Sequence, residues 1–448
     1  MKRRDLLKHT TLAALSPSLT QAAPSDRIGI GVIGCGNMGG FDQRDFQANP
    51  DVEIVAVCDV YKPSAERARE MAGGKPVIYS DYRKLLENRD VQAVVIATPE
   101  HWHALMCIDA CDAGKDVYVE KPASHNIRDG RLMVEAARRN NRIVQVGSQQ
   151  RSGVHFQRAV KYVQEGRIGN VHYATCWNHN APAVLRPTNA TANPPEGMDW
   201  DMWLGPAPKL PYDQVTNIGR RYSWEFFGGS LTEWGAHSVD IVLWAMNAKG
   251  PRSVVAAGGK FHRLEGDIPD TLQVTYEFPS FLLQYSVLQH NSFGPNGDAG
   301  AARFGSYGTQ FHGTKGTLFV DRAGFRITPQ YTRREEPNHP PRQAVLHPDE
   351  RQPGFYYTTE TLAETSDTST QHLPHVRNFL DCVKSRKRPI SDIEDGHRTN
   401  TVCRLGNIAY RTGRRLQWDV ERELVLNDEE ANRLVKGTYR APWIPKSL

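Results

Sequence analysis

The sequence predicts an α/β fold in which a doubly wound parallel sheet, the Rossmann arrangement, precedes a second domain of α+β type. Up to about residue 150, short apolar strand patterns alternate with helical patterns, as in a parallel sheet covered on both faces. After that point, longer strands of alternating polarity predict an open, largely antiparallel sheet. A chain of 448 residues is long enough for two such units, which we place at residues 25–150 and 151–448.

Five apolar runs predict the strands of the first domain, at residues 27–34, 53–59, 93–98, 116–121 and 143–147. Helices are expected between them at residues 63–72, 82–87, 101–113 and 129–140. Pro63 suits a first helical turn, and Asp81 can cap the helix that follows it. Right-handed crossovers place the carboxyl ends of the strands on one edge of the sheet, where such folds bind ligands.

The second domain opens with a helix expected at residues 154–166. Its sheet is predicted from strands at residues 171–177, 253–261, 271–278, 281–289 and 316–320, and two closing helices from residues 375–385 and 397–411. A long loop at residues 178–224 is rich in Pro, Asn and aromatic side chains. A loop of that length within a domain is usually functional, and its aromatic content argues against disorder.

Residues 1–22 have the order of an export leader, with Arg3 and Arg4 before a weakly apolar stretch and small residues. We therefore expect a twin-arginine signal peptide and a periplasmic protein, although a plain N-terminus with two adjacent arginines is the alternative. No apolar run is long enough to cross a membrane. Most of the net charge of +5 lies in this segment, so nothing indicates nucleic-acid binding. Seven scattered cysteines predict neither a disulfide framework nor a metal site.

A glycine-rich turn follows the first strand at residues 34–39, with the sequence GCGNMG. In this context Gly34 permits the tight turn, Gly36 lets a pyrophosphate approach the backbone, and Gly39 allows close packing of helix on strand. Asn37 and Met38 open the helix, whose free N–H groups and dipole favour phosphate. The motif predicts a dinucleotide site.

Asp59 ends the second strand, 20 residues after Gly39, where a carboxylate binds the adenosine ribose and repels a 2′-phosphate. NAD is therefore expected in preference to NADP, although Asp59 could also be a turn residue. Thr98 and Pro99 follow another strand at the same edge. We interpret His101 and His103 as pocket or capping groups, with His103 beside the nicotinamide; no further ligands nearby support a metal site.

Four segments resemble the Gfo/Idh/MocA oxidoreductases, and the closing region at residues 375–445 resembles an exported, twin-arginine branch of that family. The four segments are residues 34–39, 98–103, 120–122 (EKP) and 233–237 (EWGAH). The resemblance covers the chain after the leader. It implies NAD(P) in the Rossmann domain, a sugar or cyclitol over the open sheet, and hydride transfer at a secondary alcohol.

By this resemblance, Glu120 lies at the cofactor and Lys121 contacts both cofactor and substrate. His237 is then the general base. Glu233 stands where family members commonly have an aspartate, one helical turn before the histidine. The longer carboxylate could orient the histidine or the substrate, or serve another role.

We expect sugar contacts from His179, Arg221 and Tyr222 in and around the long loop, together with Lys121 and the residues of the second segment. Free NAD is scarce outside the cytoplasm, so an exported enzyme should hold its cofactor tightly. The alternative function is an NAD-dependent glycosidase or lyase that oxidises its sugar transiently. The open sheet favours a homo-oligomer, a dimer or tetramer.

Overall fold

The computed structural model describes residues 27–179, 193–212, 223–262, 266–294, 307–333, 355–357, 362–366 and 371–445. The expected leader lies outside these ranges, as do two of the expected sugar contacts, Arg221 and Tyr222. No helix within them is long and apolar enough to cross a membrane.

A six-stranded parallel sheet of order β3-β2-β1-β4-β5-β6 forms the first domain and confirms the predicted Rossmann arrangement. The order reverses between β1 and β4, so a crevice opens at the carboxyl ends of these two strands. Strand β3 was not expected. The strands are β1 (Ile28–Ile33), β2 (Val52–Cys58), β3 (Val77–Tyr79), β4 (Ala93–Ile96), β5 (Asp116–Val119) and β6 (Val144–Val146).

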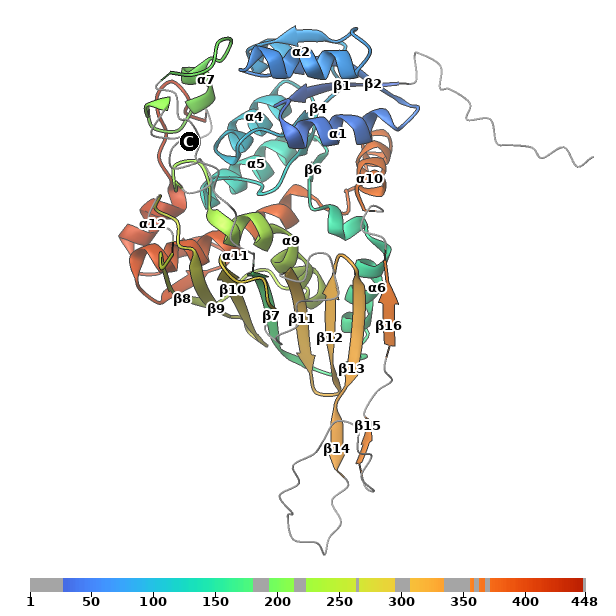
Figure 1. Cartoon of the computed structure of the whole chain (residues 1–448), viewed down its shortest axis with the longest axis vertical. Helices are drawn as coiled ribbons and strands as arrows, with labels where there is room; N and C mark the ends of the chain where they lie inside the picture. Colours follow the sequence, from blue (N-terminus) through green and yellow to red (C-terminus); the bar gives the residue numbers. More distant parts are fainter. Residues whose placement is uncertain are drawn as a thin grey trace, which may run out of the picture.

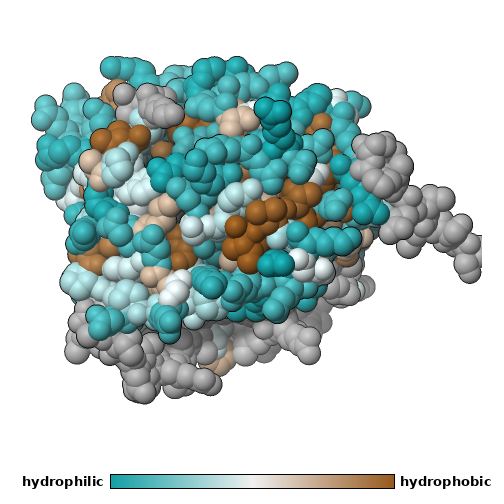
Figure 2. Space-filling model, turned by 90° about the horizontal axis from the view of Figure 1, so that it is seen from above, coloured by the Kyte–Doolittle hydropathy of each residue, from teal (hydrophilic) through white to brown (hydrophobic). Residues whose placement is uncertain are grey.

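Helices cover both faces of this sheet. The Asp81 side chain caps one of them by accepting from Arg83 N, as predicted. Seen from this end, the surface is mostly hydrophilic with only short apolar bands (Figure 2), because the helices turn polar faces to solvent. The helices are α1 (Asn37–Gln47), α2 (Lys62–Met71), α3 (Tyr82–Leu86), α4 (Glu100–Asp112) and α5 (Ile127–Arg139).

The second domain is built on a ten-stranded sheet of order β16-β13-β12-β11-β7-β10-β9-β8-β17-β18. Only β7 and β10 pair in parallel, so the sheet is largely antiparallel, as predicted. Its strands are β7 (Val171–His179), β8 (Ser253–Gly259), β9 (Thr271–Glu277), β10 (Leu282–Leu288), β11 (Tyr307–Gly313), β12 (Gly316–Asp321), β13 (Gly324–Pro329), β16 (Leu362–Thr365), β17 (Leu416–Asp419) and β18 (Leu424–Val425).

Helices α6 (Val154–Gln164), α9 (Gly229–Met246) and α11 (Ile393–Thr412) cover one face of this sheet. The strands turn alternate apolar residues toward them, so that Tyr285 and Leu283 pack with Val239 in one core. Helices α9 and α11 lie between the sheet and the Rossmann domain (Figure 1). The first turn of α9 therefore points toward the crevice.

The chain returns to the first domain late in the sequence. Helix α10 (His372–Ser385) packs Phe379 edge-on against Phe46 and Tyr118, within the core of the parallel sheet. The Rossmann core is therefore completed by residues that follow the boundary expected near residue 150.

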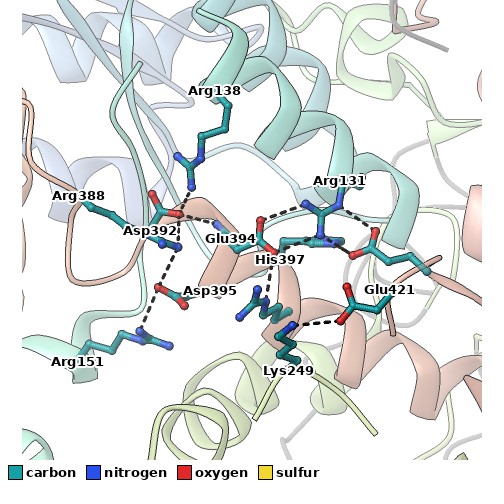
Figure 3. A network of polar contacts seen from close by, with 12 residues as sticks. Arg131, Arg138, Arg151, Lys249, Arg388, Asp392, Glu394, Asp395, His397 and Glu421 are labelled. Carbon is teal, nitrogen blue, oxygen red and sulfur yellow. Dashed lines mark hydrogen bonds and ion pairs between the residues drawn. The ribbon is translucent and has the colours of Figure 1, made fainter. Parts of the chain in front are cut away.

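Ion pairs join the two domains beside α5 (Figure 3). Arg131 on α5 donates to Glu394 at the start of α11 and to Glu423 between β17 and β18. Nε2 of the fully buried His397 lies 2.7 Å from the same Glu423 carboxylate. Arg131, Glu394 and Glu423 border a groove of about 1070 Å³. Because they bind one another, the groove is a polar seam between the domains.

Candidate active site

The glycine turn between β1 and α1 has the geometry that a dinucleotide needs. Gly34 has φ 87°, and a side chain there would meet the Ala97 backbone at 2.8 Å. A Cβ on Gly39 would lie 1.9 Å from the Gly34 carbonyl oxygen, whereas one on Gly36 would meet nothing within 4 Å. No side chain caps α1. The open space at Gly36 and the free helix N-terminus fit a pyrophosphate.

Asp59 links this turn to the loop after β2. Its carboxylate accepts from Cys35 N at 2.7 Å and from Tyr61 N at 2.8 Å. Burial raises its pKa, while these two hydrogen bonds and the charge of Arg67 oppose the rise. Arg67, which sequence reasoning missed, lies eight residues after Asp59, on α2. It lines the same cleft as Asp59, at the carboxyl edge of the parallel sheet.

A cleft of about 690 Å³ runs along the carboxyl edge of the parallel sheet. The predicted site residues that line it are Gly34, Gly36, Asn37, Met38, Asp59, Thr98, Pro99, His103, Glu120, Lys121 and Glu233. The structure therefore brings together residues from the glycine turn, three further strand ends and the second domain.

His103 is buried in the wall of this cleft. Its Nδ1 lies 2.8 Å from the Pro122 carbonyl oxygen and its Nε2 2.9 Å from that of Thr98. Burial lowers its pKa to about 4 against the effect of these two carbonyls, so the imidazole is neutral at pH 7. His101 does not line the cleft. Its Nε2 faces the Trp203 carbonyl oxygen at 3.1 Å, and its ring packs against Trp203, so it anchors the long loop.

Glu120 and Lys121 directly follow β5, and their side chains make contacts in different directions. Glu120 is buried and accepts from Gln149 Nε2 at 2.7 Å. Burial raises its pKa to about 7, while the charge of Lys121 opposes the rise. The Lys121 ammonium reaches toward α9 and donates to the Glu233 carbonyl oxygen at 3.5 Å. Lys121 therefore spans the crevice between the two domains.

His237 lies one helical turn after Glu233 on α9. It is buried, and its Nδ1 has no hydrogen-bond partner among the described residues. Burial lowers its pKa well below the usual range, and the charges of Arg322 and Lys121 lower it further. A buried nitrogen without a partner is costly in a folded protein. His237 is not among the residues that line the cleft, whereas Glu233, one turn earlier, is.

Two residues near this helix have structural roles. Arg151 forms a bidentate ion pair with Asp240, in which its Nε and Nη2 each lie 2.8 Å from a carboxylate oxygen. Both side chains are buried. The Asp240 carboxylate also accepts a hydrogen bond from Thr399 Oγ1 at 3.0 Å, so its contacts are with Arg151 and Thr399 rather than with His237.

His179 corrects one expectation. It ends β7 on the face of the large sheet away from α9, where its Nε2 lies 2.8 Å from Ser286 Oγ and its Nδ1 faces the Phe293 carbonyl oxygen. It does not line the crevice in which we expected a sugar contact. Alternation along the strand explains this, because Cys176 and Ala174 take the face covered by helices.

The sequence matches both domains of a known enzyme family. A family described as "Oxidoreductase family, NAD-binding Rossmann fold" matches residues 28–148, and its "C-terminal alpha/beta domain" matches residues 166–263 and 352–445. The chain belongs to the Gfo/Idh/MocA oxidoreductase family. Its N-terminal domain is an NAD-binding Rossmann domain.

Known Gfo/Idh/MocA relatives differ in reaction. An inositol 2-dehydrogenase of Salmonella paratyphi B is 30% identical over 158 residues, which are 35% of this chain and 46% of that protein. A glycosyl hydrolase family 109 protein of Solibacter usitatus is 28% identical over 206 residues, 41% of this chain and 47% of that protein. The chain thus matches less than half the length of these curated relatives.

The Gfo/Idh/MocA fold also appears in the solved structures. A levoglucosan dehydrogenase in complex with NADH and levoglucosan superposes with a TM-score of 0.63, covering 90% of this chain and all of that one at 16% identity. At this identity the likeness concerns the fold.

In this Gfo/Idh/MocA chain, a segment of the second domain covers the adenosine end of the cleft. It holds helix α7 (Trp200–Leu204) and is tied to the loop after β2, where Lys62 N donates to Gly197 O and Asp199 N to Val60 O. We call residues 195–207 the strap. Sequence reasoning expected a functional loop here but not its contact with the Rossmann domain. The strap residues that line the cleft are Met198, Met202 and Trp203.

Proposed function

We propose that the protein transfers a hydride between NAD and a secondary alcohol of a sugar, glycoside or cyclitol. The observation that carries the proposal is that Lys121 lines the cofactor cleft while its charge reaches the buried His237, whose Nδ1 has no hydrogen-bond partner among the described residues. The dehydrogenase names of relatives support this class of substrate. A hydroxyl is the group that satisfies such a nitrogen and also loses a proton when its carbon is oxidised.

In the proposed mechanism, bound NAD supplies the hydride acceptor. The glycine turn and Asp59 hold its phosphates and ribose. His237, neutral because it is buried, takes the hydroxyl proton on a ring nitrogen as the C–H bond breaks. Lys121 donates to the same oxygen and stabilises the negative charge that develops there. Glu233 lines the cleft and we assign it to positioning of Lys121, whose ammonium reaches the Glu233 backbone.

A redox-assisted glycosidase or lyase is the second candidate. Its support is the similarity to glycosyl hydrolase family 109 proteins and the strap over the cofactor cleft. Such an enzyme oxidises the sugar, eliminates the aglycone and returns the hydride, so it needs a cofactor that stays bound. The strap suits a resident cofactor in either reaction.

We further propose that the protein is exported with NAD already bound and works as a homo-oligomer. The paired arginines at the N-terminus support export after folding. The polar open face of the large sheet, which carries Gln273, Gln284 and Ser286, supports contact between copies. Cell fractionation and light scattering of the purified protein test these two points.

One experiment separates the two reactions. The folded protein is purified, its nicotinamide content is measured, and it is incubated with a panel of glycosides. A keto-sugar with reduced cofactor supports the dehydrogenase, whereas free aglycone without net redox change supports the lytic route. If replacing both Lys121 and His237 by Ala leaves either activity intact, the proposed mechanism is wrong.

A further inference from the structure

Arg322 lies in the turn between β12 and β13 and points at the catalytic face of α9. Its guanidinium carbon lies 5.4 Å from the centre of the Trp234 ring. Its Nε lies 3.2 Å from the Gln150 side-chain oxygen when that amide is oriented to satisfy its neighbours. Its charge also reaches His237 and His372. Arg322 is therefore close to the part of α9 that carries the proposed base, His237.

No acidic side chain pairs with Arg322 among the described residues. The adjacent Asp321 turns inward, where its carboxylate accepts from Ala323 N at 2.8 Å. Asp45, across the crevice on α1, lies 3.8 Å from His372. By contrast, four other buried or half-buried arginines have a carboxylate within 3.1 Å; these are Arg131, Arg151, Arg377 and Arg404.

The contacts of Arg322 leave its two terminal nitrogens for a ligand. The Nε donates to the Gln150 side chain, and one face of the guanidinium packs on the Trp234 ring. The two Nη nitrogens therefore remain as a fork for a ligand. Such a fork matches the two oxygens of a carboxylate, to which it donates two parallel hydrogen bonds.

Trp234 connects this cation to the proposed base. The ring is partly exposed, and it lies 6.1 Å from the His237 ring and 5.2 Å from that of Tyr307. A flat aromatic face packs against the C–H face of a pyranose. Trp234 is therefore near both His237 and Arg322.

We propose that the substrate is an acidic sugar, a uronate or a related sugar acid, and that Arg322 binds its carboxylate while His237 faces a ring hydroxyl. This inference rests on the proposed function for the position of the reacting hydroxyl. It makes Arg322 a residue that determines specificity.

The test uses matched pairs of substrates: methyl glucuronide with methyl glucoside, and methyl galacturonide with methyl galactoside. We expect kcat/KM for the acid of at least one pair to exceed that of its neutral partner by about tenfold or more. Arg322→Ala should bring this ratio close to one with unchanged NAD content, and Arg322→Lys, which keeps the charge but loses the fork, should fall between. Arg326→Ala, on the exposed face of β13 in the same hairpin, is the charge-matched control and should keep the ratio.

Equal loss for acidic and neutral sugars in Arg322→Ala would overturn the inference, as would a wild-type preference for the neutral sugars or for glucoside 6-phosphate. If no sugar of the panel is oxidised or cleaved, the proposed function fails by itself. Calorimetric binding of the same pairs to the NAD-loaded protein then decides the inference. Tighter binding of the uronide that depends on Arg322 supports it, and equal or absent binding overturns it.

Discussion

His237 has to be neutral to accept a proton from a substrate hydroxyl, and its surroundings favour that form. Burial is the largest cause of its lowered pKa, followed by the charges of Arg322 and Lys121. We expect His237→Asn to lower kcat by about 10²–10⁴-fold while the purified protein keeps its NAD. His312→Asn, on the open face of the sheet, is the matched control. Equal losses in both variants would remove the histidine from the mechanism.

The same surroundings set the acid limb of the pH profile. Activity needs the neutral imidazole, so it falls only as the pH drops through the lowered pKa of His237. We therefore expect kcat to stay level through pH 6.5, the ordinary pKa of histidine, and to decline well below it. A pH series of single-turnover rates measures this limb. A midpoint near the ordinary value would contradict the assignment of His237 as base.

The glycine turn allows cofactor binding and folding to be separated residue by residue. A methyl group at Gly36 points into open space in the cleft, so Gly36→Ala should fold normally and bind NAD about tenfold or more weakly. Gly39→Ala meets the Gly34 carbonyl at 1.9 Å and should lower the melting temperature. Gly40→Ala meets nothing and is the helix control. Nucleotide content and thermal unfolding distinguish the three variants. A Gly36→Ala protein with full NAD content would show that the glycine turn does not hold the pyrophosphate.

At the scale of elements, the Rossmann half of the fold was predictable because its signals are local. Each parallel strand is a continuous apolar run, and the glycine turn and Asp59 lie at fixed distances along the chain. The pairing of the larger sheet was harder. Strand β11 contains two glycines and three polar residues, and β13 follows β12 after a turn of only two residues, so neither strand was recognised in the sequence.

The residues of the site were predictable from the sequence only where they belong to a recognisable motif. Lys121 and His237 belong to recognisable segments, whereas Arg67 reaches the cleft and Arg322 reaches Trp234 through tertiary folding from positions without a sequence pattern. His179 was misplaced because strand alternation, rather than closeness to the long loop, decides which face its side chain takes.

The C-terminal tail fastens the strap, and this contact predicts slow exchange of the cofactor. Arg440 donates from Nε to the Gly205 carbonyl at 2.8 Å and from both Nη atoms to Asp201. Trp443 packs edge-on against Trp102 of α4. The tail thus binds the strap and the Rossmann domain together.

Arg440→Ala removes several hydrogen bonds to the strap at once. We expect bound NAD to dissociate about tenfold faster or more, since charge-assisted bonds of this kind contribute about 1.5–3 kcal/mol each. Arg433→Ala, an exposed arginine on α12 (Glu429–Lys436), is the matched control. Release is followed after dilution into excess labelled NAD. An unchanged rate in Arg440→Ala would show that the strap does not retain the cofactor.

At the scale of the whole molecule, the crevice exists only while the two domains stay docked, and the ion pairs of Figure 3 give that docking a pH dependence. Burial opposes the charge on Glu423, but hydrogen bonds from His397 and Arg131 outweigh it and lower its pKa from 4.5 to about 2. The side chain is 18% exposed. A carboxyl group whose pKa is lower in the folded than in the unfolded protein stabilises the folded state at every pH above its unfolded pKa. This stabilisation is lost as the pH falls through the folded pKa.

The shift corresponds to about 3 kcal/mol of unfolding free energy, complete above pH 5 and lost toward pH 2. We expect Glu423→Gln to be less stable than the wild type by up to that amount at pH 7, and the difference to close as the pH approaches 2. Glu421→Gln, whose side chain is 79% exposed and pairs only with Lys249, should change stability by less than about 1 kcal/mol. Urea unfolding at a series of pH values measures all three proteins. If the two variants lose stability in parallel, the seam contributes through surface charge alone and the docking of the domains rests on their apolar contacts.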